Sequence, residues 1–388
     1  FALHVWVFMM LRTLRGASRT IGFTIVLALL FFQTKIILCD RSSATRLDLG
    51  NSHHGKGQDA VDWSRFAYSQ YATNTAYLCN SVMIFETLHR LHSKADRLLM
   101  YPLSFSADEN ENGTESRLLR KARDEYNVKL VPVRVQTGNR EDPTWSKSFT
   151  KLLAFNQTQY SRVLSLDSDV TMLQHMDELF FLPPCPLAFP RAYWLDPDHR
   201  VMTSYLMIIE PSELEFDRIV TATATSQTSD YDMEIVNAIY RDHALIIPHR
   251  PYTLLTGEFR EVVHAKYLGS SREVWNPQKA LMEAKTVHFS DWPVPKPWVD
   301  FPSNAMNEHK PSCHWNVTSG GDDDCRDRDY WLGIYFDFNN RRKVCGFAAA
   351  LFEASADRFR MSAVTFTGYP IPIQATMLVT FCPELWLD

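Results

Sequence analysis

Residues 162–169 read Arg-Val-Leu-Ser-Leu-Asp-Ser-Asp, and this stretch decides how the rest of the chain is interpreted. Val163 to Leu166 is a short apolar run, typical of a strand buried on both faces of a parallel sheet. Asp167 and Asp169 follow it directly. Ligands of open α/β sheets gather beyond the carboxyl ends of the strands, so both carboxylates are expected at a ligand-binding edge. Carboxylate oxygens suit magnesium or manganese, which predicts a site for a divalent cation and a nucleotide diphosphate.

The spacing of these two aspartates is not specific by itself. A solvated turn explains most pairs of this kind, and four others occur, at Asp196/Asp198, Asp230/Asp232, Asp322/Asp324 and Asp327/Asp329. Only the pair at Asp167 and Asp169 follows a predicted buried strand. The setting, rather than the spacing, therefore carries the prediction.

Hydrophobic periodicity predicts helices and strands in alternation along the chain. Helices are expected at 74–92, 115–126, 146–156, 212–222 and 231–240, and strands at 97–101, 128–135, 162–166, 205–209 and 245–247. This order is typical of an α/β fold with a mostly parallel sheet and helices on both faces. The sequence contains no glycine-rich phosphate loop, so phosphate binding is expected to depend on a metal and basic side chains.

Length and composition fit one large catalytic domain. The chain has 388 residues, of which 45% are hydrophobic and 13% aromatic, and its net charge is −5. These values indicate a globular protein and give no electrostatic reason to expect a nucleic-acid partner. They leave the oligomeric state open.

The amino end differs from the rest of the chain. Arg12, Arg15 and Arg19 precede the largely apolar segment 21–39, whose length is close to the ~20 residues that span a bilayer. The arginines favour a cytoplasmic tail at 1–20, a transmembrane signal anchor at 21–39 and a translocated remainder, as in a type II membrane protein. A cleaved signal peptide is the alternative, because the uninterrupted apolar part, 21–32, has the length of a signal-peptide core.

After this segment, 40–65 is polar and aperiodic, as a stem or linker would be. The catalytic domain is expected at 66–300 with a C-terminal extension at 301–345, while 346–388 stays unassigned. Glycosylation sequons at Asn112, Asn156 and Asn316 are compatible with a luminal location. An oxidising compartment would also permit disulfides, and Cys313 and Cys325, which flank a loop rich in Gly and Asp, form the preferred pair.

Four blocks of the chain resemble glycosyltransferase family eight, the glycogenin-like family, and especially its fungal glucose N-acetyltransferase-like (N-acetylglucosaminyltransferase) branch. Their order and separation, rather than any one of them, make the resemblance specific. The blocks are Tyr71 to Tyr77, Phe149 to Ser161, Leu166 to Phe180, and Val287-His288-Phe289-Ser290 with Lys296-Pro297-Trp298.

The resemblance implies a GT-A fold (nucleotide-diphospho-sugar transferase) and a retaining transfer of a sugar from a UDP-sugar donor. It also implies that Asp167, Asp169 and His288 hold manganese, with magnesium possible as a substitute. Two carboxylates and an imidazole suit this metal. A histidine that only completes the end of a strand is the alternative for His288.

The resemblance assigns the remaining site residues as follows. Lys151 and Lys296 would bind the diphosphate, because a compact cation suits phosphate, although a lysine on a solvated face is the alternative for both. The nucleotide would meet Tyr71, Thr73, Asn74, Tyr77 and Ser168. Tyr77 fits the core of the first helix equally well. Asp232 would face the donor sugar and act with Lys151 in catalysis, unless it only supplies a negative charge at a helix amino terminus.

Two features depart from the family pattern. Many members carry an Asn-Ser-Gly turn against the donor sugar, whereas this chain has Thr203-Ser204-Tyr205, which leaves the sugar open. The loop 289–295 is longer than in glycogenin-like members and lacks their glycine, which could move Lys296. Within and after this loop, Trp292 and Trp298 suit either an apolar platform for an acceptor sugar or ordinary packing.

Together these features predict a metal-dependent retaining glycosyltransferase of the Golgi membrane, which transfers N-acetylglucosamine or glucose to a glycan acceptor. The alternative is a catalytically inactive UDP-sugar-binding or lectin-like protein on the same fold. A soluble glycogenin-like protein that glucosylates itself conflicts with the apolar segment.

Overall fold

The chain is seen in a computed structural model that describes residues 61–136, 147–195, 200–299, 305–315, 321 and 323–346. The predicted tail, membrane anchor and most of the stem, at 1–60, lie outside the described residues, as does 347–388. Among the helices of the described ranges, none is both long enough and apolar enough to cross a membrane.

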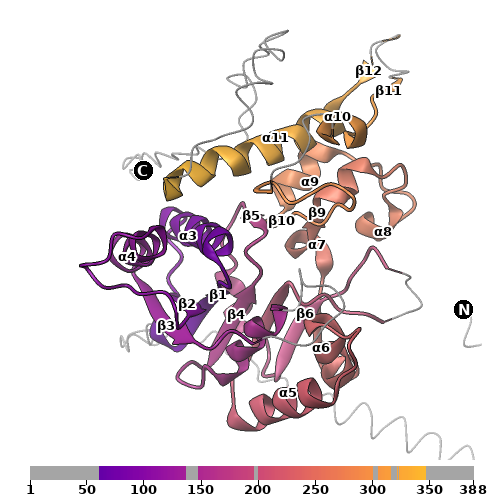
Figure 1. The fold of residues 1–388 in the computed structure, drawn as a ribbon. Coiled ribbons are helices and arrows are strands. Elements are labelled where there is room, and N and C mark those ends of the chain that lie inside the picture. Colours follow the sequence, from indigo (N-terminus) through magenta and orange to yellow (C-terminus); the bar gives the residue numbers. More distant parts are fainter. Residues whose placement is uncertain are drawn as a thin grey trace, which may run out of the picture. The chain divides into compact units, whose positions relative to one another are not determined.

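A seven-stranded sheet forms the centre of the described part of the chain (Figure 1). Its strand order is β3-β2-β1-β4-β7-β6-β8. The strands are β1 (Phe66–Tyr71), β2 (Asp96–Pro102), β3 (Val128–Val133), β4 (Arg162–Leu166), β6 (Leu187–Pro190), β7 (Leu206–Ile209) and β8 (Leu245–Ile247). Neighbours pair in parallel except β7, which is antiparallel to both β4 and β6. The prediction of a mostly parallel sheet is therefore confirmed.

Both faces of this sheet are covered by helices, because alternate strand residues point to opposite sides. Tyr68, Leu99 and Leu164 pack into one core with the helices α3 (Thr75–Arg90) and α4 (Thr114–Tyr126). Ala67, Leu98 and Val163 pack into another core. That second core includes residues of η2 (Ser148–Asn156), α5 (Glu213–Thr225) and α6 (Asp232–Tyr240). Figure 1 shows α3 and α4 on one side of the strands and α5 and α6 on the other.

A second, three-stranded sheet contains β10, the strand that ends at His288. Its order is β5-β10-β9, with β5 at Val170–Met172, β9 at Leu254–Leu255 and β10 at Thr286–His288. β10 is antiparallel to β5 and parallel to β9. Since β5 begins directly after Asp169, this pairing brings residues more than a hundred positions apart to the end of β4.

The last α-helix of the described residues, α11 (Arg326–Arg341), packs onto the core that α3 and α4 also form. Its Trp331, Tyr335 and Phe338 are buried there. The disulfide between Cys79 of α3 and Cys345 of η5 (Arg342–Cys345) ties its end to the first helix. The predicted bond between Cys313 and Cys325 is confirmed.

The shorter elements connect these parts. They are η1 (Trp63–Arg65), η3 (Asp177–Phe181), α7 (His249–Tyr252), η4 (Thr256–Arg260), α8 (Ala265–Leu268), α9 (Pro277–Glu283), α10 (Ala305–His309), β11 (His314–Trp315) and β12 (Asp323–Asp324).

The predicted elements occur with small differences. The strand at 162–166 has the predicted bounds, whereas the strand predicted at 128–135 ends at Val133. The predicted helix at 146–156 is a 3₁₀ helix over 148–156. Helical spacing of apolar residues does not distinguish an α-helix from a tighter one.

Candidate functional site

Parallel pairing of β1 with β4 brings the first two predicted site residues together. The register places Ser69 opposite Ser165, so Tyr71 and Asp167 leave the sheet at the same edge. The Tyr71 hydroxyl lies 3.4 Å from Asp167 Oδ1. Below them, Gln70 Nε2 donates to the Leu166 carbonyl at 2.6 Å, which holds the end of β4 to its neighbour.

The predicted metal ligands form one cluster. One ligand atom from each of Asp167, Asp169 and His288 lies within 4.8 Å of the others. The β5–β10 pairing places His288 opposite Val170, and Phe289 N donates to the Asp169 carbonyl at 2.9 Å. His288 Nε2 lies 3.2 Å from Asp169 Oδ1. A set of two carboxylates and one imidazole fits manganese or magnesium.

The His288 ring is held in place by its surroundings. Its Nδ1 is buried and meets no hydrogen-bond partner among the described residues. A buried nitrogen without a partner costs free energy. Tyr205 stacks on the ring, with 4.5 Å between ring centroids and 23° between planes. The imidazole is thus held by packing, with Nε2 directed to Asp169 in the cluster and Nδ1 buried away from it.

Lys151 lies buried between two carboxylates. Its Nζ is 2.7 Å from Asp167 Oδ1 and 2.8 Å from Asp232 Oδ2. Burial acts to lower the pKa of Lys151, but the charges of Asp167 and Asp232 outweigh it and raise that pKa. The same lysine lowers the pKa of Asp232 against the effect of burial. Lys151 therefore carries its charge throughout the physiological pH range, and the solvated-face alternative does not apply to it.

A second lysine, Lys296, contacts the other aspartate, Asp169. Lys296 Nζ lies 2.8 Å from Asp169 Oδ2 and also donates to the Phe289 carbonyl. Burial acts to raise the pKa of Asp169, but Lys296 and His288 outweigh it and lower that pKa. Asp167 behaves differently, because burial, with Asp169 and Asp232 nearby, raises its pKa to about 6 in spite of Lys151. The longer loop thus leaves Lys296 within reach of the cluster.

The residues predicted for nucleotide binding border this cluster. Asn74 caps α3, and its Oδ1 accepts from Tyr77 N at 3.0 Å, so this side chain has a structural partner. Thr73 lies beside it in the turn between β1 and α3. Burial and the charges of Asp169 and Asp167 raise the pKa of Tyr77 to about 12, which keeps its hydroxyl a donor. Ser168 is buried between the two aspartates.

Two site residues were not predicted, although both lie in the turn that departs from the family pattern. Ser204 Oγ donates to Asp232 Oδ2 at 2.6 Å, and this is the oxygen that Lys151 also contacts. Tyr205, besides stacking on His288, donates its hydroxyl to the Tyr252 carbonyl at 2.5 Å. The signal in the sequence was the departure itself, because Thr203-Ser204-Tyr205 stands where the family pattern has Asn-Ser-Gly.

The two tryptophans after His288 have different surroundings. Trp298 is partly buried and packs edge to face on Tyr77, with 5.6 Å between ring centroids, and also against Phe338. Trp292 is exposed. The packing alternative therefore holds for Trp298 and not for Trp292.

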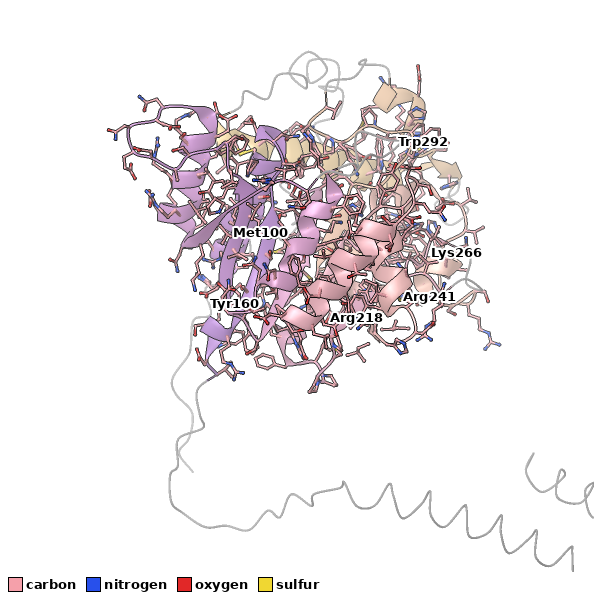
Figure 2. All side chains as sticks on the ribbon, turned by 60° about the horizontal axis from the view of Figure 1, so that its bottom comes forward. Met100, Tyr160, Arg218, Arg241, Lys266 and Trp292 are labelled. Atoms are coloured by element: carbon pink, nitrogen blue, oxygen red, sulfur yellow. A yellow bond between two sulfur atoms is a disulfide. The ribbon has the colours of Figure 1, made fainter. Side chains whose placement is uncertain are left out.

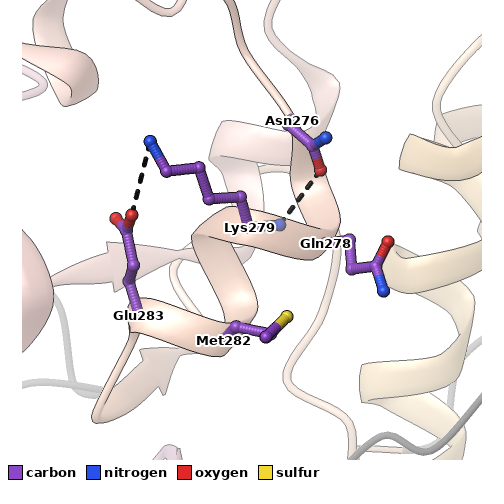
Figure 3. A pocket seen from close by; sticks show the side chains of 5 residues that line it. All are labelled: Asn276, Gln278, Lys279, Met282 and Glu283. Carbon is purple, nitrogen blue, oxygen red and sulfur yellow. Dashed lines mark hydrogen bonds and ion pairs between the residues drawn. The ribbon is translucent and has the colours of Figure 1, made fainter.

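A hollow elsewhere on the surface holds no comparable chemistry. Asn276, Gln278, Lys279, Met282 and Glu283 line it, all from α9 and its amino-terminal cap (Figure 3). Its polar groups are occupied locally, because Asn276 Oδ1 caps Lys279 N at 3.0 Å and Lys279 pairs with Glu283 at 3.6 Å. We therefore place the functional site at the aspartates rather than in this hollow.

Comparison with known proteins supports the resemblance. The chain is 58% identical to glucose N-acetyltransferase 1 of Gibberella zeae over 74% of its length and 63% of that protein. It is 48% identical to glucose N-acetyltransferase 1 of Aspergillus fumigatus over 74% of its length and 78% of that protein. The match thus spans less than two thirds of the Gibberella protein. No model of a protein family matches the chain.

Among solved structures, two glycosyltransferases show distant similarity. The glycosyltransferase GlyE of Streptococcus pneumoniae TIGR4 is 15% identical, with a TM-score of 0.44, over 70% of this chain and 60% of that chain. The galactosyltransferase LgtC in complex with donor and acceptor sugar analogs is 12% identical, with a TM-score of 0.43, over 70% and 95%.

Proposed function

The chain belongs to the family of fungal proteins named glucose N-acetyltransferase 1, and from this premise and the site we propose that it is a metal-dependent glycosyltransferase of the GT-A type. It would transfer N-acetylglucosamine or glucose from a UDP-sugar to a glycan, with retention at the transferred carbon. The cluster of Asp167, Asp169 and His288 beside two lysines carries the proposal.

This arrangement suits a nucleoside diphosphate. Without a glycine-rich loop, negative phosphate oxygens need cations, and Lys151 and Lys296 approach the cluster from two sides. Bound at the three ligands, manganese would neutralise the charge that develops on the departing UDP. Both lysines are already ordered by Asp167 and Asp169, so they need little reorganisation to stabilise that charge.

Asp232 and Ser204 would act on the donor sugar. Lys151 and Ser204 both bind Oδ2 of Asp232, which fixes the carboxylate at the amino terminus of α6. The helix dipole favours its ionised form. An anchored carboxylate can accept a hydrogen bond from a sugar hydroxyl and stabilise positive charge at the carbon being transferred.

The alternative is a protein that binds UDP-sugar without turnover. Either protein would use the two lysines to bind the diphosphate. The enzyme is favoured because the site also fixes Asp232, through Lys151 and Ser204, where a carboxylate could act on the donor sugar, and binding alone does not require this. The Thr203-Ser204-Tyr205 turn, which raised the alternative, contacts Asp232 and His288 in the structure.

We also propose that the catalytic domain lies in the Golgi lumen, anchored by 21–39. Two disulfides suit an oxidising compartment. Asn112 is exposed within its sequon and could carry a glycan. An Asn112→Gln change should then remove an endoglycosidase-sensitive mass from the protein made in a fungal host. If endoglycosidase removed no mass from the protein at any of the three sequons, the result would contradict luminal exposure.

The activity is tested by measuring UDP release from a panel of UDP-sugars, with manganese and with a chelator. The expected result is release from one donor that depends on manganese and increases with a glycan acceptor. The anomeric configuration of the product, read by NMR, tests retention. Saturable UDP binding without release from any donor would favour the binding protein.

A further inference from the structure

Trp292 has the most exposed large apolar side chain among the described residues. Its exposed fraction is 91%. It lies between the metal ligand His288 and the diphosphate lysine Lys296, and Figure 2 labels it near the margin of the folded unit. A single exposed apolar residue on a protein surface is ordinary. This one is notable because the chain on either side of it is held firmly.

The fixed points lie directly beside the tryptophan. The Asp291 side chain is buried, binds the Arg260 guanidinium, and accepts from Trp331 Nε1 at 2.7 Å. Val294 is buried, and its N–H donates to the Asp291 carbonyl at 2.7 Å. Two residues further on, Lys296 contacts Asp169. The chain on both sides of Trp292 is therefore anchored to the folded unit, and the indole lies exposed between these anchored residues.

A second loop adjoins this turn through the Arg260–Asp291 pair. Gly257, in η4 of the same segment, approaches so closely that a Cβ there would lie 3.1 Å from the Ser290 carbonyl oxygen. Just after Arg260, Val262 and Val263 are 79% and 71% exposed. Two neighbouring loops thus present Trp292, Val262 and Val263 to solvent.

We propose that Trp292 is the stacking residue of a subsite for a neutral glycan acceptor, with Val262 and Val263 exposed on the neighbouring loop. The inference rests on the proposed function. An acceptor hydroxyl must reach the donor sugar next to the diphosphate, and Trp292 lies on the segment that also supplies His288 and Lys296. A pyranose has an apolar face of C–H groups, which covers an indole while its hydroxyls stay in water.

The Trp292→Ala variant separates this role from donor chemistry. Acceptor KM should rise about tenfold, the loss of roughly one stacking contact, whereas UDP release in the absence of acceptor should stay unchanged. Trp292→Phe should restore most of the affinity because it keeps a flat ring. Leu214→Ala is the matched control, since Leu214 is also exposed, at 68%, and lies on α5 rather than in the turn that carries Trp292.

Direct binding makes the test independent of turnover. Neutral oligosaccharides of hexoses and N-acetylhexosamines are titrated into the purified protein by calorimetry, with UDP and manganese present. Binding that Trp292→Ala weakens about tenfold and Leu214→Ala leaves unchanged supports the subsite, even if no donor is turned over and the proposed activity fails. Equal binding by wild type and Trp292→Ala overturns it, as does the absence of binding by every oligosaccharide. Loss of vesicle binding alone in the variant would also overturn it, in favour of a membrane contact.

Discussion

The buried Lys151 forms an ion pair with the half-buried Asp167, with 2.7 Å between Nζ and Oδ1, inside the cluster that would hold the metal. The same carboxylate is therefore shared between a lysine and a metal site. A cation fixed beside a metal ligand opposes metal binding by charge repulsion while it favours the binding of an anionic diphosphate.

Lys151→Ala should accordingly separate two properties. Manganese binding without nucleotide should stay the same or tighten several-fold, whereas turnover should fall by roughly 100-fold or more, as expected for loss of a preorganised charge-stabilising group. Calorimetric titration and UDP release measure the two effects. Lys129→Ala is the control, because Lys129 forms an exposed ion pair with Asp96. Weaker manganese binding with normal turnover would contradict this role for Lys151.

Tyr205 should influence metal affinity without being a ligand. Its ring stacks on His288, and its hydroxyl is held by Tyr252 and Thr286. Tyr205→Phe keeps the stack, so manganese affinity should change by less than about threefold, whereas Tyr205→Leu should weaken it about tenfold by freeing the imidazole. Affinities are measured on variants shown to be folded by circular dichroism. Equal affinity in both variants would show that the stack does not position His288.

The raised pKa of Asp167 should make metal binding depend on pH. Burial and nearby carboxylates raise its pKa to about 6, above the unfolded value of about 3.9. The folded, metal-free protein thus holds the proton more tightly, and this stabilising contribution is present below pH 4 and lost as pH rises through about 6. Manganese needs the ionised form, so its affinity should increase by up to about tenfold per unit between pH 5 and 6.

Comparison with Asp167→Asn isolates this titration. The unfolding free energy of wild type minus that of the variant should fall by roughly 2–3 kcal/mol between pH 4 and 7 in the absence of metal. Chemical denaturation across that range measures it. A difference that stays constant with pH would show that Asp167 titrates normally.

The two disulfides should differ in their contribution to stability. The Cys79–Cys345 bond joins residues 266 positions apart, whereas Cys313 and Cys325 are 12 apart. A longer closed loop restricts the unfolded chain more, so loss of the first bond should cost about 2–3 kcal/mol more than loss of the second. Melting of the two double serine variants measures this, and greater destabilisation by Cys313→Ser/Cys325→Ser would contradict it.

The sequence predicts those parts of the site that follow local rules. The end of a buried strand placed Asp167 and Asp169 at a ligand-binding edge, and the blocks of family resemblance added His288, Lys151 and Lys296. Ser204 and Tyr205 could not be given their roles in this way. These depend on β7 lying antiparallel to β4 and on β10 returning beside β5, which are pairings between distant segments. The Cys79–Cys345 bond has the same origin.

The measurement that tests the central claim most directly is UDP release from the preferred donor by wild type, Asp169→Asn and Asp242→Asn, each with manganese and with a chelator. Asp242 is an exposed aspartate that pairs with Arg241, so its variant controls for loss of charge. We predict manganese-dependent release by wild type and Asp242→Asn, and release reduced by at least about 100-fold in Asp169→Asn. Release that persists in Asp169→Asn, or that the chelator leaves unchanged in wild type, would contradict a metal-dependent transfer at this site.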